Sequence, residues 1–198
     1  EQAFESDTIL VSIMAANNET GVLQPIEAIG QLCHDQGVIF HTDAAQALGK
    51  IPIDVRSMQI DVLSMTAHKL YGPKGIGALY VRRKNPRVQL SPQFHGGGQE
   101  RGLRSGTLYP PQIVGFGAAV RLALETLDDE HKRLTGLRDR LWQHLSKLSN
   151  IHLNGHPTHR LPNNLNISIA VDYIKNLHIQ LQSEVAITPG SASRSGKT

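Results

Sequence analysis

The sequence predicts an α/β fold with a mostly parallel sheet. Short apolar, β-prone runs alternate with a segment of helical periodicity, beginning with a strand-like run at 8–15 and a helical pattern at 25–36. Strand, helix and strand in succession favour a parallel sheet covered by helices, because parallel strands need a long crossover connection. The 198 residues, 39% of them hydrophobic, are enough for a sizeable core in one or two domains.

Four strands and one helix are expected before the glycine-rich middle of the chain. Pro25 suits the first turn of the helix and Gly37 its end, and the apolar residues between them recur at helical spacing. A polar loop at 17–21 separates this helix from the strand before it. The four strands are expected at 8–15, 38–41, 62–65 and 76–81.

In the remainder of the chain the expected secondary structure changes twice, first from a glycine-rich loop to a long helix and then to short elements. Five glycines within 89–111 indicate an ordered functional loop, and a long helical pattern then covers 111–148, with a break near Gly136. Short elements are expected after it: strands at 151–153 and 164–169, a helix at 177–182 and a strand at 185–188. These changes divide the chain into three expected parts: 1–110, 111–149 and 150–198.

Charge, cysteine content and hydropathy exclude several classes of function. The formal net charge is only +3, and the one dense basic cluster, 82–87, has no aromatic side chains around it, so no nucleic-acid site is expected. The single cysteine, Cys33, excludes an internal disulfide and lies among apolar helix positions, where a core residue is expected. No apolar run reaches membrane-spanning length and no signal-peptide pattern opens the chain, so we expect a cytoplasmic protein without membrane contact. Neither end looks natural, which indicates a fragment.

Lys69 and Asp43 are the strongest candidate site residues. Lys69 follows the β-prone stretch 60–65 and precedes a Gly/Pro-rich turn, which places an amine at the mouth of a strand, where α/β folds hold ligands. Asp43 ends an earlier strand-like run. Pyridoxal phosphate needs such a pair, because a lysine forms the Schiff base with its aldehyde and an aspartate keeps its pyridine nitrogen protonated.

Neighbouring side chains strengthen this interpretation. Gln46 comes three residues after Asp43, so one helical turn would bring both to one side. Thr66 and His68 flank Lys69 closely enough to bind the phosphate of the same cofactor. Taken singly, Lys69 is expected to be an ordinary surface lysine, and Asp43 is expected to be the N-cap of the turn that follows it. Only the combination points to a cofactor.

Three other motifs predict no site. Gly190 and Gly196 are separated by five residues, whereas a phosphate-binding Walker loop requires four. The run 95–98 is similar to the oxyanion loop of lipases, but no Gly-x-Ser-x-Gly elbow accompanies it. Three histidines at 152, 156 and 159 lie around a probable turn without a carboxylate or thiol nearby, so exposed histidines are expected and no metal site.

Four motifs together resemble the cysteine desulfurases, fold-type I pyridoxal phosphate enzymes that supply sulfur for iron–sulfur clusters. The motifs are NNETG at 17–21, HTDAAQ at 41–46, AHKLYGPKG at 67–75 and HGGGQERGLRSGT at 95–107. The resemblance implies the aspartate aminotransferase-like fold. Within it, 1–110 would be the C-terminal part of the large cofactor domain, 111–149 a linking helical segment and 150–198 the beginning of a small α+β domain.

The resemblance also implies roles for individual residues. Family members are homodimers with sites at the subunit interface, and they convert L-cysteine to L-alanine while passing the sulfur to a cysteine and then to an acceptor such as an iron–sulfur scaffold protein. Carried over by motif, the roles are: Lys69 for the covalent link and proton transfer, Asp43 for the pyridine nitrogen, Asn18 and Gln46 for the phenolic oxygen, Thr66 and His68 for the phosphate, and Thr107 for the phosphate of the other subunit.

One position departs from the family pattern. The nucleophilic cysteine of the family lies in Gly-Ser-Ala-Cys, and this chain reads Gly-Ser-Ala-Ser, with Ser193 in the place of the cysteine. A hydroxyl cannot carry sulfur as a persulfide, and Cys33 is far upstream, so we predict that this chain is inactive as a desulfurase. Two alternatives stay open: a non-catalytic relative that acts as a scaffold, and a lyase similar to selenocysteine lyase.

Overall fold

A computed structural model describes residues 2–170, 181 and 183–185. The strand and helix order supports the predicted α/β class, with four strands and a helix before the long helical segment. The elements are β1 (Leu10–Met14), α1 (Ile26–Asp35), β2 (Ile39–Asp43), β3 (Val62–Thr66), the short 3-10 helix η1 (Ala67–Leu70), β4 (Gly77–Val81), a second 3-10 helix η2 (Gln99–Gly102), α2 (Pro110–Glu125), α3 (Leu127–Leu145), β5 (Ile151–Leu153) and β6 (Ile167–Ile169).

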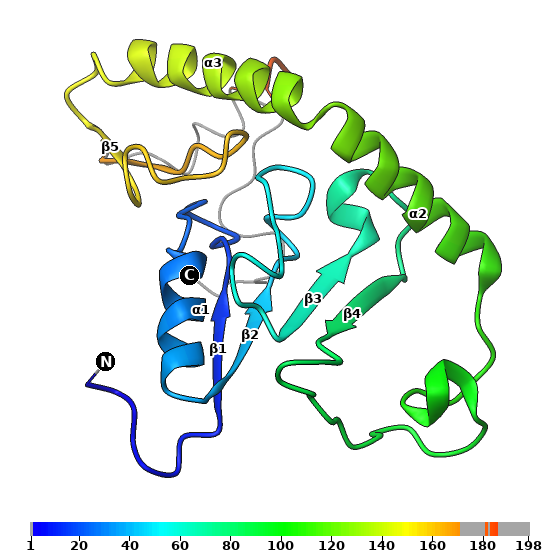
Figure 1. Cartoon of the computed structure of the whole chain (residues 1–198). Helices are drawn as coiled ribbons and strands as arrows, with labels where there is room; N and C mark the ends of the chain where they lie inside the picture. The colour runs from blue at the N-terminus through cyan, green and yellow to red at the C-terminus, as the bar shows by residue number, and fades with distance from the viewer. Residues whose placement is uncertain (1, 171–180, 182, 186–198) are drawn as a thin grey trace.

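The main sheet has the order β1-β2-β3-β4, with its strands side by side in Figure 1. β1 pairs with β2 and β2 with β3 in parallel, as predicted, whereas β4 runs antiparallel to β3. The short connection explains the reversal, because η1 and one tight turn are too short for a crossover that would bring the chain back in parallel. β1, β2 and β3 therefore end at one edge, which we call the carboxyl edge.

Helix α1 and the segment 51–60 cover one face of the sheet. The core there is fully closed: Phe40, Cys33 and Ile60 are 0% exposed and Leu63 is 2% exposed. Cys33 is thus a core residue, as the sequence predicts. On the opposite face the apolar side chains Leu10, Met14 and Leu79 are exposed, and the register of the strands places them on that one face.

The long helical segment breaks at a different residue from the one expected. α2 ends at Glu125 and α3 begins at Leu127, with Thr126 between them at φ −111° and ψ 5°. Thr126 also donates its hydroxyl to the carbonyl of Leu122 at 3.0 Å, a local bond that competes with helix continuation. Gly136 lies inside α3, so the prediction of a break there is wrong. Figure 1 shows α2 beside β3 and β4, and α3 above the β5 region.

The last described segment forms a small two-stranded sheet. β5 and β6 pair antiparallel, with Ile151 opposite Ile169. These strands confirm the expected run at 151–153 and shorten the one at 164–169. The helix and strand expected at 177–188 fall almost wholly outside the described residues. Among the residues that the structure describes, no helix is both long and apolar enough to cross a membrane.

Candidate functional site

Strand register brings the predicted polar side chains to the carboxyl edge. Met14 and Asp43, the last residues of β1 and β2, are opposite each other, and Asp43 is opposite Ser64, two residues before the end of β3. Thr66 follows Ser64 by two positions and therefore lies on the same face of the sheet as Asp43. In open α/β sheets ligands bind outside this edge. The predicted placement of Asp43 and Thr66 thus follows from the backbone itself.

Asp43 is an exposed carboxylate that also caps the turn after β2. One of its oxygens accepts a hydrogen bond from the backbone N–H of Ala45 at 2.8 Å. The residues after it form consecutive turns and no regular helix, so the helical turn expected to align Gln46 is absent. Gln46 lies half-buried within these turns, and its backbone carbonyl accepts a bond from Lys50 Nζ at 3.0 Å.

The phosphate candidates Thr66 and His68 contact each other directly. Thr66 Oγ1 and His68 Nδ1 are 2.9 Å apart, which joins a hydroxyl and an imidazole at the start of η1. Lys69 follows within η1 and is exposed, with its side chain free to face solvent at the end of β3. Gly72 closes the turn by donating to the carbonyl of Ala67 at 3.0 Å. The amine and the hydroxyl–imidazole pair thus belong to one short, backbone-closed unit.

Lys50 is a neighbour of the site that sequence reasoning missed. It is half-buried, and burial lowers the pKa of its ammonium below the usual lysine value, while the positive charge of Lys69 lowers that pKa further. Two amines are therefore close enough to repel each other. The signal in the sequence was weak, because a lysine after Gly49 looks like an ordinary surface residue.

The loop after β1 carries Asn18 and is organised by its neighbour. Asn17 Oδ1 accepts hydrogen bonds from the backbone N–H groups of Glu19 and Thr20 at 3.0 and 2.9 Å and from the Thr20 hydroxyl at 3.1 Å. Asn18 is exposed within this loop. The organising role of Asn17 was also missed, although an asparagine followed by Gly21 four residues later is a known turn former.

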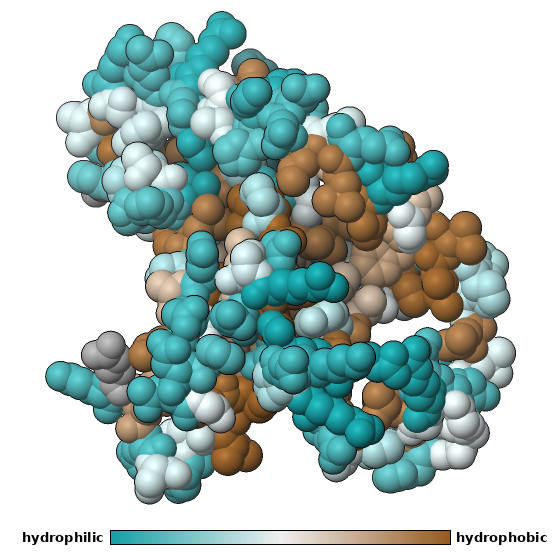
Figure 2. Space-filling model, in the orientation of Figure 1, coloured by the Kyte–Doolittle hydropathy of each residue, from teal (hydrophilic) through white to brown (hydrophobic). Residues whose placement is uncertain are grey.

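The structure does not bring Thr107 to the carboxyl edge of its own chain. Thr107 is exposed, and the green segment that carries it loops out at the lower right of Figure 1, away from the carboxyl ends of β1 to β3. Exposed apolar side chains surround this part of the chain and continue along α2, where Figure 2 shows hydrophobic residues gathered: Phe94, Leu103, Leu108, Tyr109, Ile113, Val114, Leu122 and Leu124. Ser193 lies outside the described residues.

Cys33 is buried, and His156 and His159, two of the three histidines noted in the sequence, pack against each other. Cys33 is 0% exposed, and burial raises the pKa of its thiol, with the negative charge of Asp61 raising it further. Such a thiol forms little thiolate and is not a nucleophile. His156 and His159 pack with ring centroids 4.5 Å apart, yet nowhere among the described residues do three metal-ligating side chains gather.

The donor set at the carboxyl edge fits pyridoxal phosphate. It offers one carboxylate (Asp43), one exposed amine (Lys69), amide groups (Asn18 and Gln46) and a hydroxyl–imidazole pair (Thr66 and His68). These are the groups that the pyridine nitrogen, the aldehyde, the phenolic oxygen and the phosphate of that cofactor require. The carboxylate is the last residue of β2, and the amine lies in η1 directly after the adjacent strand β3.

Comparison with known families and sequences gives consistent matches. The family described as aminotransferase class-V matches residues 1–196. Cysteine desulfurase IscS of Methylobacillus flagellatus is 53% identical over 193 residues, covering 98% of this chain and 47% of that protein. Cysteine desulfurase IscS of Aeromonas hydrophila is 52% identical over 195 residues, covering 98% of this chain and 48% of that protein. The chain therefore spans about half the length of these curated relatives.

Solved structures agree with the sequence matches. A NifS-like protein from Rickettsia africae superimposes with a TM-score of 0.86 at 32% identity, covering 96% of this chain and 52% of that one. Another NifS-like protein gives a TM-score of 0.79 at 42% identity, covering 85% of this chain and 46% of that one. The backbone fold of this chain is thus shared with these proteins.

Proposed function

Because this chain belongs to the class-V aminotransferase family, we propose that its carboxyl edge binds pyridoxal phosphate and that it forms part of a cysteine desulfurase. The observation that supports the proposal is the strand register, which sets Asp43 and Thr66 on one face at the ends of β2 and β3, with Lys69 following in η1. When bound, pyridoxal phosphate supplies an electron sink for carbanion chemistry at the substrate Cα. The substrate of the proposed activity is L-cysteine and the product L-alanine.

Each side chain at the carboxyl edge would have its own role in binding the cofactor or moving a proton. The Asp43 carboxylate would hold a proton on the pyridine nitrogen, while Asn18 and Gln46 donate to the phenolic oxygen. Thr66 and His68 would anchor the phosphate. Lys69 Nζ would hold the cofactor covalently and, once displaced by substrate, move the proton of the substrate Cα.

A second subunit would complete the site. Thr107 is exposed, and the green segment that follows β4 in Figure 1 extends away from the carboxyl ends of β1 to β3, which fits a role at the phosphate of a partner copy. The exposed apolar side chains near it and along α2 give such a homodimer an apolar surface to bury. We further propose that the protein passes sulfur to an acceptor such as an iron–sulfur scaffold, and that the parts 1–110, 111–149 and 150–198 are the large domain, linker and small domain.

Ser193 limits the activity of this chain. A serine hydroxyl has a far higher pKa than a thiol and cannot form a persulfide, and the buried Cys33 cannot replace it. We therefore propose that the chain does not turn over L-cysteine. Ser193 is also the observation that favours the alternatives, a non-catalytic scaffold or a lyase for selenocysteine that needs no persulfide.

Cofactor binding is tested by adding pyridoxal phosphate and recording the absorbance band of the lysine-linked cofactor. The band should form with the unsubstituted chain and vanish in Lys69→Ala. Lys74→Ala is a matched control, because Lys74 is an exposed lysine of the same turn and should leave the band unchanged. An absent band in the unsubstituted chain, or equal loss in both variants, would refute the assignment.

The role of position 193 is tested by alanine and sulfide release from L-cysteine in the presence of a thiol reductant. The unsubstituted chain should release neither product. Ser193→Cys should gain activity where the rest of the site is competent, while Ser191→Cys, two residues away, should not. Turnover by the unsubstituted chain would show that the inactivity proposal is wrong, and the same assay with L-selenocysteine tests the lyase alternative.

A further inference from the structure

Arg160 is a buried cation without a carboxylate partner. It is 3% exposed, and among the described residues no acidic side chain lies within ion-pair distance of it. Its Nε and Nη1 atoms are buried and make no hydrogen bond within that same part of the chain. Burial lowers the pKa of the guanidinium, and the charge of Arg138 lowers it further. Burying a charge costs folding free energy unless the group is paired and hydrogen-bonded, so the hydrogen bonds that Arg160 makes are important to its placement.

The contacts that Arg160 does make converge on the loop that carries Asn18. Its Nη2 donates to the carbonyl of Thr20 at 2.7 Å, and also lies 3.2 Å from the Asn154 carbonyl and 3.3 Å from Asn164 Oδ1. Asn164 in turn donates through Nδ2 to the carbonyl of Glu19 at 3.0 Å. Arg160 and Asn164 together therefore link the segment 154–164 to Glu19 and Thr20, the two residues that follow Asn18.

Further bonds from the same region surround this contact. Asn166 donates to the same Glu19 carbonyl at 3.0 Å, and the backbone N–H of Leu161 donates to the carbonyl of Gly21 at 2.8 Å. Gly21 has φ +73°, and a Cβ there would lie 2.5 Å from the side chain of Asn164. The two segments thus approach so closely that only glycine fits. The loop 17–21 is held along its whole second half by residues about 140 positions later.

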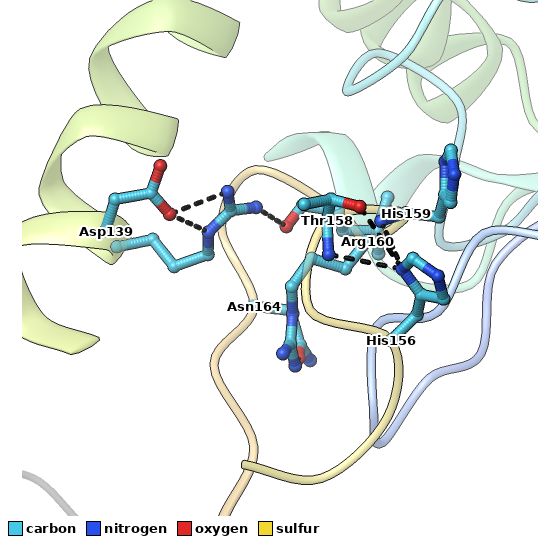
Figure 3. Close-up of polar contacts among 8 residues, drawn as sticks. Asp139, His156, Thr158, His159, Arg160 and Asn164 are labelled. Carbon is cyan, nitrogen blue, oxygen red and sulfur yellow. Dashed lines mark hydrogen bonds and ion pairs between the residues drawn. The ribbon is translucent and has the colours of Figure 1, made fainter. Parts of the chain in front are cut away.

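The segment 154–164 is itself fixed from the other side. Arg138 of α3 donates through Nη1 to the carbonyl of Leu161 at 2.9 Å while pairing with Asp139 at 2.8 Å. His156 Nδ1 accepts the backbone N–H groups of Thr158 and His159, which closes the turn before Arg160. Figure 3 shows Asp139 on α3 at one side of this network and His156 at the other, with Arg160 and Asn164 between them. The turn that carries Arg160 is therefore held by hydrogen bonds from α3 on one side and from His156 on the other.

We propose that Arg160 is a positioning residue that holds the loop 17–21 so that Asn18 faces the cofactor. The inference rests on the proposed function, because it assigns Arg160 an effect through Asn18 on a cofactor that the carboxyl edge would bind. Asn17 shapes the loop from within, and Arg160 sets where the loop lies relative to the sheet. The third part of the chain thereby positions one loop of a site whose other groups within the same chain come from the first part.

Amide hydrogen exchange without added cofactor tests the first half of the inference. In Arg160→Met, the amides of Glu19, Thr20 and Gly21 should exchange about tenfold faster or more, the scale expected for losing one hydrogen bond to a charged group. Arg160→Lys should give a smaller increase, because a lysine offers a point charge without the guanidinium fork. Amides of α1 should not change, which separates local loosening from global unfolding.

Arg138→Met is the matched control for that measurement. It removes a bond of similar length to the same segment, at Leu161, without touching any atom of the loop. Exchange at Glu19, Thr20 and Gly21 should accelerate less in this variant than in Arg160→Met, because Arg138 holds the segment but contacts no atom of the loop. Equal acceleration in Arg138→Met and Arg160→Met, or no acceleration in Arg160→Met, would overturn the inference.

A double-variant cycle on cofactor affinity tests the second half. Arg160→Lys should weaken pyridoxal phosphate binding severalfold in the unsubstituted background and have little effect in Asn18→Ala, because the residue through which it acts is gone. A full effect of Arg160→Lys in Asn18→Ala would overturn the inference. The absence of any cofactor band in the unsubstituted chain would instead refute the proposed function, while the exchange measurement would still report on the loop.

Discussion

The buried ion pair of Asp61 and Arg82 joins strands of the main sheet at the end opposite the carboxyl edge, before β3 and after β4. Arg82 Nε lies 2.8 Å from Asp61 Oδ1, and the two side chains are only 11% and 9% exposed. Asp61 Oδ2 also accepts the backbone N–H of Phe40 at 3.0 Å, and Arg82 Nη2 donates to the carbonyls of Val55 and Ile60. One pair thus joins β2, the start of β3, the end of β4 and the segment that covers the core.

The cost of breaking this pair can be worked out from its surroundings. Asp61→Asn removes the negative charge but keeps an oxygen for the Phe40 N–H. Removing one partner of a buried pair costs about 3–5 kcal/mol, because the other charge stays buried. Arg82 retains its two carbonyl partners, so we expect the low end, about 3 kcal/mol of unfolding free energy. A domain is stabilised by only about 5–15 kcal/mol in total, so the loss should be plain.

Urea denaturation followed by circular dichroism measures this loss. Adding Arg82→Met to Asp61→Asn removes the stranded cation, so the double variant should be more stable than Asp61→Asn alone. Glu130→Gln, which breaks an exposed pair with Arg133 on α3, is the control and should not shift the midpoint measurably. An unchanged midpoint in Asp61→Asn, or a double variant less stable than Asp61→Asn, would refute the reasoning.

Three further predictions follow from single positions. Gly21→Ala should lower the unfolding free energy by at least about 1–2 kcal/mol in denaturation, because φ is +73° and its Cβ would meet Asn164; an unchanged midpoint would contradict the contact. Gly136→Ala should raise it by about 1 kcal/mol, because the glycine lies in open space inside α3; destabilisation would be evidence against that. Lys69→Met should raise the pKa of Lys50 in an NMR titration, since a nearby positive charge is removed, and an unchanged pKa would show that the two amines do not interact.

Local sequence signals predicted the elements well where pattern and packing agree. The apolar runs that became β1, β2 and β3 are short and β-prone, and β2 and β3 contribute buried residues to the core, so periodicity and burial agree for these two strands. The direction of β4 is set by the length of the connection through η1, which no hydropathy pattern encodes. The helix breaks at Thr126, where the hydroxyl bonds to the carbonyl of Leu122. The break predicted at Gly136 is absent, because a glycine inside a helix costs only about 1 kcal/mol.

The residues of the candidate site also differ in whether the sequence alone could place them. Asp43, Thr66 and Lys69 could be predicted because each follows a strand, and strand ends of a parallel sheet share an edge by construction. Arg160 could not, because its importance lies in contacts with residues about 140 positions earlier in the chain. In the sequence it is one arginine before a Leu-Pro pair, indistinguishable from a solvated residue. Long-range contacts of this kind exist only once the chain has folded.

In the proposed function, cofactor binding and sulfur transfer depend on different parts of this chain, so one can be lost without the other. The groups for the cofactor come from strand ends and loops that register and hydrogen bonds fix in place, from Asp43 to the loop held by Arg160. The group that should accept sulfur is a single side chain, and there the chain has Ser193. Ser193 belongs to none of the strands β1 to β3, whose register sets Asp43 and Thr66 on one face. The same sequence can therefore retain the cofactor chemistry at the substrate Cα and lack the step that takes the sulfur away.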